Sequence, residues 1–521
     1  MQFRTKAACA LIAGLLLGLA INSYADPLKV KTEQGKVHGK TINSGKVKAF
    51  LGLPYAAPPV GDLRWKAPGA PAKWKGTREA TKFGAYCAQN HVFDDMVFQD
   101  SAPSEDCLFL NIYAPAEATG KSKLPVMFWI HGGGYSGGGS NEPRHNGDFL
   151  PLKGVVLVTI NYRLGIFGFL ATDELAKEAN GAAGNYGLLD MVAALHWVQN
   201  NIKNFGGDPG NVTIFGESAG SFAVSTLMAS PLAQGLFAKA IGESGAAFPS
   251  ALTLGGETVA ERAKTDGAWM DSIGAKSIKD LRAMTTDQIL EASKKNKAGF
   301  PPDVDGRLLT EPVPDTFAAG KQAHVPLLAG WNADEGSFFA MRGMTAAQWT
   351  GMANGLFKDR AADFLKLYPA NDDAQSLRSA IDYGSDAFIA FSTWKWLEAQ
   401  KKTGEAPVYR YHFELAATPS KFHPGTFAFH SDDIEYVFGT LDTRPGFNVR
   451  PEDRKLSDEM MTYWTNFAKT GDPNGSGLPN WPKLDADDAL IHLNTSITSG
   501  PDTLRARYDF LLQGIPPLRF Q

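Results

Sequence analysis

The sequence predicts an α/β fold, with a central, mostly parallel sheet, helices on both faces and large insertions. Two continuous apolar runs, at residues 126–130 and 155–160, have the composition of strands buried on both faces. A third run, rich in β-branched residues, lies at 212–215, and residues 188–198 before it have apolar positions at helical spacing. This alternation of strand and helix is typical of a doubly wound sheet.

The first 25 residues have the pattern of a secretory signal. Arg4 and Lys6 precede an apolar run at residues 10–21, and small residues stand at Ser23 and Ala25, where a signal peptidase would cut after Ala25. The apolar run is shorter than the roughly 20 residues of a membrane-spanning helix. We therefore expect a cleaved signal over residues 1–25 and a secreted or periplasmic protein.

After the signal, the composition indicates one large globular domain over residues 26–521. No Pro/Ser-rich linker, charge block or repeat divides the sequence. The balance of 51 Lys and Arg against 55 Asp and Glu argues against nucleic-acid binding, and no membrane span is expected after cleavage. The two remaining cysteines, Cys87 and Cys107, can close one loop in an exported chain, which is worth roughly 3 kcal/mol; buried free thiols are the alternative.

Other segments extend this outline in chain order. Residues 30–50 alternate polar and apolar side chains and are broken by turn residues, which predicts antiparallel hairpins at an edge of the sheet. The mixed, largely helical stretch at 257–310 is predicted to be an insertion able to wall a pocket. Further strands are predicted at residues 108–113, 238–242, 325–330 and 408–413.

The pattern Gly-x-Ser-x-Gly occurs twice, around Ser218 and around Ser136. Ser218 follows the strand at 212–215 and precedes a run of small and apolar residues typical of a helix. A sharp turn between a strand and a helix presents a serine above the sheet, as a nucleophile requires. Ser136 leads into a polar loop without helical pattern, so we predict Ser218 as the nucleophile. The alternative is that Ser218 only caps the helix.

A serine nucleophile needs a base, and the histidines differ in their suitability. In this fold the functional groups follow the carboxyl ends of strands. His412 and His492 lie within predicted strands, whereas His423 and His430 both lie in the loop after the strand at 408–413. His430 stands near the onset of the next element, so we favour it over His423.

An orienting carboxylate is expected after the strand at 325–330. Asp334 and Glu335 both stand there, and spacing alone does not choose between them. The oxyanion of an acyl-transfer reaction needs backbone N–H donors that side chains do not obstruct. The glycine-rich segment at 131–134 follows the strand at 126–130, and the N–H of Ala219 follows the nucleophile.

Several further motifs are shared with a known family. They are Gly52-Leu53-Pro54-Tyr55-Ala56, Pro58-Pro59-Val60-Gly61, Leu63-Arg64-Trp65, Ser104-Glu105-Asp106-Cys107-Leu108-Phe109-Leu110-Asn111, Asn161-Tyr162-Arg163-Leu164-Gly165 and Phe205-Gly206-Gly207-Asp208-Pro209. On these motifs the chain resembles the carboxylesterase type B family of α/β-hydrolases, which includes carboxylesterases and cholinesterases. The resemblance spans nearly all of the sequence after the signal, and it implies the α/β-hydrolase fold.

The resemblance also implies roles for individual residues and no metal or cofactor. It places the catalytic triad on Ser218, Glu335 and His430, and the oxyanion donors on Gly133, Gly134 and Ala219. It further implies a Cys87–Cys107 disulfide and the ion pairs Arg64–Glu105 and Arg163–Asp190. The chain departs from the family pattern at Ser221 and Ser431, where glycine is usual or common.

The expected activity is hydrolysis of small to medium uncharged esters through an acyl-enzyme. The segment between Cys87 and Cys107 contains no tryptophan to face a quaternary ammonium, so choline esters are not expected. A histidine base predicts activity that rises from roughly pH 6 to 7.5. Two alternatives are a catalytically silent binding or adhesion relative, which an intact triad argues against, and an interfacial lipase, which activity above and below the solubility limit of an ester distinguishes.

Overall fold

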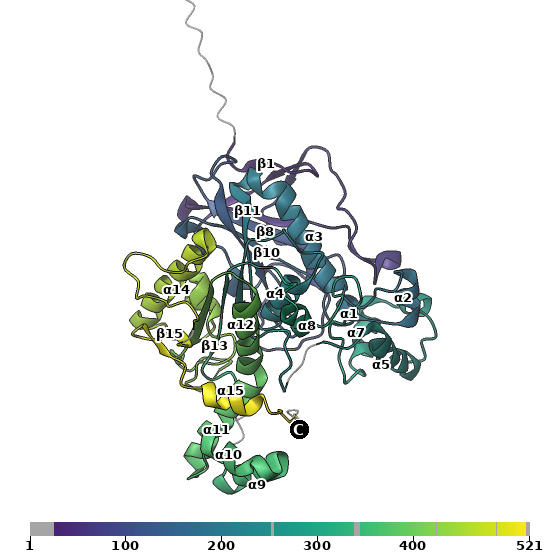
Figure 1. The fold of residues 1–521 in the computed structure, drawn as a ribbon. Helices are drawn as coiled ribbons and strands as arrows, with labels where there is room; N and C mark the ends of the chain where they lie inside the picture. The colour runs from purple at the N-terminus through teal and green to yellow at the C-terminus, as the bar shows by residue number, and fades with distance from the viewer. Residues whose placement is uncertain (1–25, 252–254, 338–343, 424, 486, 517–521) are drawn as a thin grey trace, which may run out of the picture.

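The computed structural model describes residues 26–251, 255–337, 344–423, 425–485 and 487–516 (Figure 1). The expected signal, residues 1–25, lies outside the described residues. An eleven-stranded sheet runs through the molecule in the order β16-β15-β14-β13-β12-β11-β9-β10-β8-β4-β3. Its strands are β3 (Lys40–Ile42), β4 (Val47–Pro54), β8 (Phe109–Pro115), β9 (Leu124–Ile130), β10 (Val156–Ile160), β11 (Gly207–Glu217), β12 (Lys239–Glu243), β13 (Leu327–Asn332), β14 (Val408–Phe413), β15 (Ala489–Leu493) and β16 (Thr498–Pro501).

The centre of the sheet, from β15 to β10, is parallel, and the strands at both ends are antiparallel. Strand β9 shows why its sequence is continuously apolar. Val126, Phe128 and Ile130 belong to the hydrophobic core on one face of the sheet, and Met127 and Trp129 to the core on the other. Since both faces are buried, every position of the strand is apolar.

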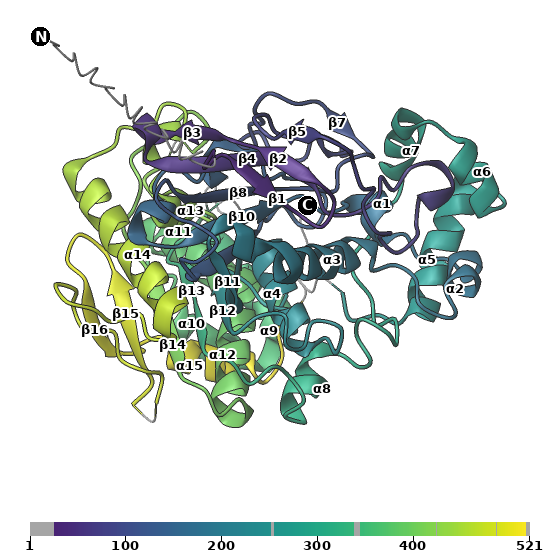
Figure 2. The same ribbon diagram turned by 90° about the horizontal axis from the view of Figure 1, so that it is seen from above.

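Helices cover both faces of the sheet (Figures 1 and 2). One core contains side chains of α3 (Tyr186–Asn201), α4 (Ala219–Ala229), α8 (Val313–Ala318) and α12 (Phe391–Thr403). The other contains side chains of α13 (Ile434–Phe438) and α14 (Pro451–Thr470). The predicted α/β fold class is therefore confirmed.

The N-terminal hairpins are divided between two sheets. Strands β3 and β4 pair antiparallel at the edge of the main sheet, as predicted. By contrast, β1 (Lys29–Lys31) and β2 (Lys36–His38) join β5 (Thr77–Glu79) in a separate three-stranded sheet. The chain passes from one sheet to the other at Gly39, where a Cβ atom would lie 2.5 Å from the Ala49 carbonyl oxygen.

Two helical segments extend from the sheet. The predicted insertion holds α5 (Val259–Ser272), α6 (Ile278–Ala283) and α7 (Thr286–Ser293), beside α1 (Gly165–Phe169) and α2 (Asp173–Glu178). Its ends, with Phe222 of α4, line a cavity of about 400 Å³. A second segment was not predicted and forms the lower lobe in Figure 1, against the C-terminal α15 (Arg505–Leu511): α9 (Ala346–Phe357), α10 (Ala361–Leu367) and α11 (Asp373–Ser385).

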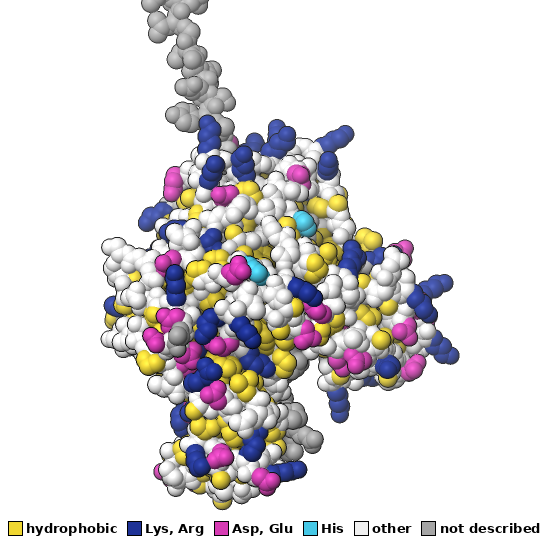
Figure 3. Space-filling model, in the orientation of Figure 1, with side chains coloured by type: hydrophobic (Ala, Val, Ile, Leu, Met, Phe, Trp, Pro, Cys, Tyr) yellow, Lys and Arg dark blue, Asp and Glu magenta, His cyan; other side chains and the backbone are white. Residues whose placement is uncertain are grey.

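The surface fits the near-neutral composition. On the face in Figure 3, Lys and Arg side chains are interspersed with Asp and Glu over most of the area. Among the residues that the structure describes, no helix has both the length and the apolar character needed to cross a membrane.

Candidate active site

Ser218 occupies a strained turn between β11 and α4. Its backbone has φ +52° and ψ −123°, a conformation that costs a non-glycine residue about 1–3 kcal/mol. The neighbouring strand β9 passes close to this turn. A Cβ atom on Gly216 would lie 2.5 Å, and one on Gly220 2.0 Å, from the Ile130 carbonyl oxygen. Both glycines are therefore required by packing, and the turn holds the Ser218 side chain beyond the end of the strand.

His430, in the loop after β14, lies between Ser218 and Glu335, which follows β13. His430 Nε2 lies 2.9 Å from Ser218 Oγ, and His430 Nδ1 lies 2.5 Å from Glu335 Oε2. Because the carboxylate can only accept, Nδ1 carries the proton and Nε2 is free to accept the hydroxyl proton. Glu335 is fully buried, and its other oxygen accepts the Asn332 N–H at 2.8 Å. This arrangement can activate the serine as a nucleophile.

The alternatives for the nucleophile and the base lie apart from this cluster. The Ser136 hydroxyl donates to the Gly134 carbonyl oxygen at 3.2 Å. The His423 ring stacks on Phe429, with centroids 3.6 Å apart, and its Nε2 lies 3.9 Å from an Asp95 oxygen. Neither side chain contacts Ser218 or Glu335 in any described interaction.

Asp334, the alternative carboxylate, has a different set of partners. One of its oxygens accepts from Arg378 at 2.5 Å and the other from the Ala428 N–H at 2.9 Å. The Asp334 N–H in turn donates to the Ala428 carbonyl oxygen, and Asp334 forms an isolated bridge with Phe429. Asp334 therefore holds the loop that leads to His430 against the end of β13, while Glu335 faces the histidine.

The glycine-rich loop after β9 lies directly over the serine. A Cβ atom on Gly132 would approach Ser218 Cβ to 3.2 Å and the Glu217 backbone oxygen to 2.9 Å. Gly133 and Gly134 have φ values of +102° and +60°. Within the described part of the chain, the N–H groups of Gly133, Gly134 and Ala219 donate no hydrogen bond, so they are free to bind an oxyanion.

Glu217, which precedes Ser218, contacts the candidate base and was not singled out from the sequence. It is 3 % exposed, and its Oε1 lies 3.3 Å from His430 Nε2 without a hydrogen-bond partner among the described residues. Burial raises the pKa of Glu217 to about 8 against the opposing effect of His430. Burial lowers the pKa of His430, but Glu217 and Glu335 outweigh it and raise that pKa to about 9. The histidine therefore stays protonated to a higher pH than an ordinary imidazole.

Two apolar side chains adjoin the site and were also missed. Met96, in the segment between the cysteines, lies against the oxyanion loop, with its Cε 2.8 Å from the position of a Cβ atom on Gly133. The Phe388 ring lies 5.3 Å from that of His430, on a π-helical turn at Asp386–Ala390. A π-helical turn is common at functional sites, but the sequence carries no pattern that identifies one.

The two phenylalanines between the cysteines lie differently. Phe98 stacks on Tyr86, and Phe93 is 43 % exposed.

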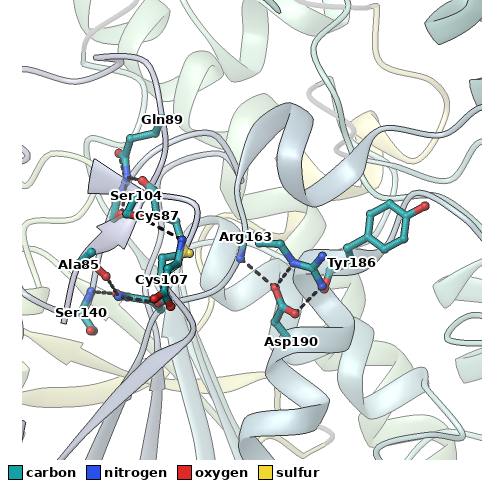
Figure 4. Close-up of a disulfide and its surroundings, with 12 residues drawn as sticks. Ala85, Cys87, Gln89, Ser104, Cys107, Ser140, Arg163, Tyr186 and Asp190 are labelled. Carbon is teal, nitrogen blue, oxygen red and sulfur yellow. Dashed lines mark hydrogen bonds and ion pairs between the residues drawn. A yellow bond between two sulfur atoms is a disulfide. The ribbon is translucent and has the colours of Figure 1, made fainter. Parts of the chain in front are cut away.

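The disulfide and both ion pairs implied by the resemblance are present. Cys87 and Cys107 are bonded, with Cα atoms 4.9 Å apart, and Figure 4 shows this bond beside the Arg163–Asp190 pair. Arg163 donates from two nitrogens to Asp190 at 2.8 and 2.7 Å. Arg64 similarly donates to Glu105 at 2.7 and 2.6 Å. Such paired bonds hold the segment of Cys107 through Glu105 and tie Arg163 to α3.

The two departures from the family pattern have structural counterparts. Ser431 adopts φ +71°, in the left-handed region that favours glycine. The Ser221 hydroxyl donates to the Gly245 carbonyl oxygen at 2.5 Å, which ties α4 to the turn after β12. Neither side chain bonds to Ser218, Glu335 or His430 in the described interactions.

Comparisons with known proteins identify the family of the chain. The model of the "Carboxylesterase family" matches residues 26–510. Fumonisin B1 esterase of Sphingopyxis macrogoltabida is 38 % identical to this chain, in an alignment that covers 91 % of this chain and 88 % of the relative. Carboxylesterase 1D of Rattus norvegicus is 34 % identical, in an alignment that covers 91 % of this chain and 90 % of the relative. A solved PNB esterase superposes with a TM-score of 0.80, at 33 % identity over 92 % of this chain and 99 % of that one. The chain therefore belongs to the carboxylesterase family and is a carboxylic ester hydrolase of the α/β-hydrolase fold.

Proposed function

We propose that Ser218, His430 and Glu335 are the catalytic triad of a serine carboxylesterase. The observation that carries the proposal is the pair of contacts made by one imidazole, 2.9 Å to the Ser218 hydroxyl and 2.5 Å to the Glu335 carboxylate. In the first step, Ser218 Oγ attacks the ester carbonyl carbon while His430 Nε2 takes the hydroxyl proton. Glu335 stabilises the resulting imidazolium and keeps its orientation.

The negative oxygen formed in this step is assigned to the N–H groups of Gly133, Gly134 and Ala219. Losing one such donor typically costs about 10²–10³ in turnover. When the carbon–oxygen bond to the alcohol breaks, His430 returns its proton to the leaving oxygen, and an acyl-Ser218 ester remains. Water then attacks this ester with His430 again as base, releasing the acid and restoring the serine hydroxyl.

The test compares the two serines of the duplicated motif. Ser218→Ala should lower kcat for p-nitrophenyl butyrate by several orders of magnitude. Ser136→Ala should leave it nearly unchanged, because within the described part of the chain the Ser136 hydroxyl donates to the Gly134 carbonyl oxygen and contacts no other candidate catalytic group. A fluorophosphonate probe should label Ser218 alone, read by peptide mass spectrometry. Equal losses in the two variants, or a label elsewhere, would refute the assignment.

We also propose that the substrates are small to medium esters without a cationic group. The site is bordered by Met96 and by Phe388, and no tryptophan lies between the cysteines. Of the acids in that segment, Asp95 is paired with Arg144 at 3.5 Å, which offsets its charge. The kcat/KM for butyrylcholine should not exceed that for its neutral 3,3-dimethylbutyl isostere. A tenfold preference for the cation, about 1.4 kcal/mol, would disprove this.

Finally, we propose that residues 1–25 direct export and are removed, so that the enzyme works in the periplasm or outside the cell as one domain. The basic and apolar pattern of these residues and the presence of a disulfide support this location. The mass of the protein purified from the periplasm or medium should correspond to a chain that begins at Asp26. An intact Met1 on the functional protein would contradict it.

A further inference from the structure

Two histidines and a glutamate converge on the parallel pair β14 and β15, in addition to the site of Ser218. His412 and His492 are direct partners in this pair, so their side chains lie on one face. Glu414 follows the end of β14 and receives both imidazoles on a single oxygen. Its Oε1 lies 2.9 Å from His412 Nδ1 and 2.6 Å from His492 Nδ1. The ligating atoms of all three side chains lie within 4.8 Å of one another.

We propose that His412, Glu414 and His492 form a binding site for a divalent transition-metal ion, of which zinc is the type case. Two imidazole nitrogens and one carboxylate oxygen are a donor set that suits zinc, nickel or copper, whereas magnesium and calcium prefer oxygen alone. The resemblance to carboxylesterases implies no metal, and this site takes no part in the proposed ester hydrolysis.

The geometry is close to what such an ion requires. A tetrahedral zinc with bonds of about 2.0–2.2 Å keeps its ligand atoms roughly 3.3–3.5 Å apart. The two nitrogen–oxygen distances, 2.9 and 2.6 Å, must therefore widen by roughly 0.4–0.9 Å. The three side chains can move by this amount, since His412 is 15 % exposed and Glu414 and His492 are each 26 % exposed. Solvent can then supply the fourth ligand.

The positive side chains near the site are paired with carboxylates. Arg410, which opposes positive charge at His492, is paired with Asp488 at 3.2 Å and with Asp502 at 3.1 Å. Arg507, which lines the same pocket as His412, is paired with Asp382 at 3.0 Å and with Asp386 at 3.5 Å. Asp386 and Asp502 add negative potential at His412 and His492.

A metal ion bound here would link β15 to β14, close to the edge of the sheet where β16 pairs antiparallel with β15. A ligand that binds only the folded chain stabilises it in proportion to the logarithm of its concentration above Kd. This link would therefore make the thermal stability of the sheet edge depend on the metal concentration, while the ester-hydrolysing site stays unchanged.

The experiment uses the mature chain, purified without a histidine tag and stripped with EDTA. Titration with ZnCl₂ in a calorimeter should show one site per chain, and an excess of zinc should raise Tm. His492→Gln and Glu414→Gln should each weaken binding by more than about tenfold, since even outer-shell partners are typically worth 10- to 100-fold in metal affinity. The matched control is His196→Gln, an exposed histidine of α3.

Cobalt provides a second measurement. With the wild type and the control variant, Co²⁺ should give a visible d–d absorption spectrum. This spectrum should be absent with both site variants. If one site variant fails to fold, the other carries the comparison. No zinc binding by the wild type at 100 µM, or equal binding by the folded site variants and the control, would overturn the proposal.

Discussion

Two neighbouring strands, β11 and β12, end in the same two residues and are each followed by a serine, but only one of these serines is the candidate nucleophile. Gly216-Glu217 of β11 pairs in register with Gly242-Glu243 of β12, and a serine follows each. Ser218 and Ser244 both have positive φ, +52° and +59°. Their N–H groups donate to the carbonyl oxygen at the end of the next strand, at 2.8 and 2.9 Å respectively. The two serines thus share a positive φ and the same kind of backbone hydrogen bond to the neighbouring strand.

The difference lies in what other segments bring to each serine. Ser218 is partly accessible, begins a helix and meets His430. Ser244 is fully buried, no helix begins there, and its hydroxyl has no hydrogen-bond partner in the part of the chain that the structure describes. A strained turn after a strand is therefore not sufficient for a nucleophile. Reactivity requires a base supplied from elsewhere.

The glutamates before the two serines differ in the same way. Among the described residues, each glutamate has one oxygen without a hydrogen-bond partner. That of Glu217 lies 3.3 Å from His430 Nε2, whereas Glu243 lies beside Trp464, whose indole N–H donates to its other oxygen at 2.7 Å. Burial raises the pKa of Glu243 well above its usual value, with Asp433 adding to the effect. We infer that Glu217 influences the reaction through His430 and that Glu243 is a neutral, packed residue.

The largest effect is expected when Glu335, the carboxylate that orients His430 beside Ser218, is replaced. Glu335→Gln should lower kcat by about 10³–10⁴, because an amide no longer fixes the imidazole tautomer or stabilises the imidazolium. Asp334→Asn is the matched control from the adjacent position and should cost far less, since Asp334 bonds to Arg378 and Ala428. The reverse order of damage in p-nitrophenyl ester hydrolysis would transfer the orienting role to Asp334.

A smaller effect should separate the two glutamates. Because the pKa of His430 is raised to about 9, the neutral base accumulates only toward alkaline pH, above the range of 6 to 7.5 expected for an ordinary histidine. Above its own pKa of about 8, Glu217 places a negative charge 3.3 Å from His430 Nε2. Glu217→Gln removes this charge, which lowers the histidine pKa and moves the rising limb of kcat/KM toward lower pH by about one unit.

Glu243→Gln is the control for this shift, since Glu243 bonds to Trp464 and lies one strand away from β11. Its pH profile of kcat/KM should coincide with that of the wild type. If both variants shift the profile equally, Glu217 has no special relation to His430. If neither does, the charge of Glu217 does not determine the protonation of the base.

The sequence supports the sheet and the nucleophile more fully than it supports the base and the acid. The strands β9, β10 and β14 and the turn at Ser218 follow from local patterns, because burial on both faces and the close approach of β9 restrict the residue types. The start of β13 was placed two residues early, since Pro326 has no N–H to donate to the ladder.

The remaining choices depended on contacts between distant segments. Asp334 and Glu335 are adjacent in sequence, and spacing does not choose between them. His423 and His430 share one loop, where the position near the next element favours His430, and their partners in the structure separate both pairs. Arg378 engages Asp334, and Phe429 stacks on His423. The family resemblance selected Glu335 and His430 where spacing did not. The lobe of α9, α10 and α11 and the positions of Met96 and Phe388 had no local signal that identified them.

The smallest expected effect tests whether Glu243 is a neutral packed residue. A buried acid with a raised pKa contributes its full stability below the unfolded pKa, near 4.5, and loses it as pH rises, because the unfolded chain ionises first. This loss amounts to about 1.4 kcal/mol per pH unit. Glu243→Gln keeps an acceptor for Trp464 but does not ionise, so its Tm should exceed that of the wild type by an amount that grows on the order of 1 °C per unit from pH 5 to pH 8. Differential scanning calorimetry at a fixed scan rate measures this difference. A constant or shrinking gap would mean that Glu243 is ionised in the folded protein, and the contrast between the two glutamates would then lie in their partners and not in their charge.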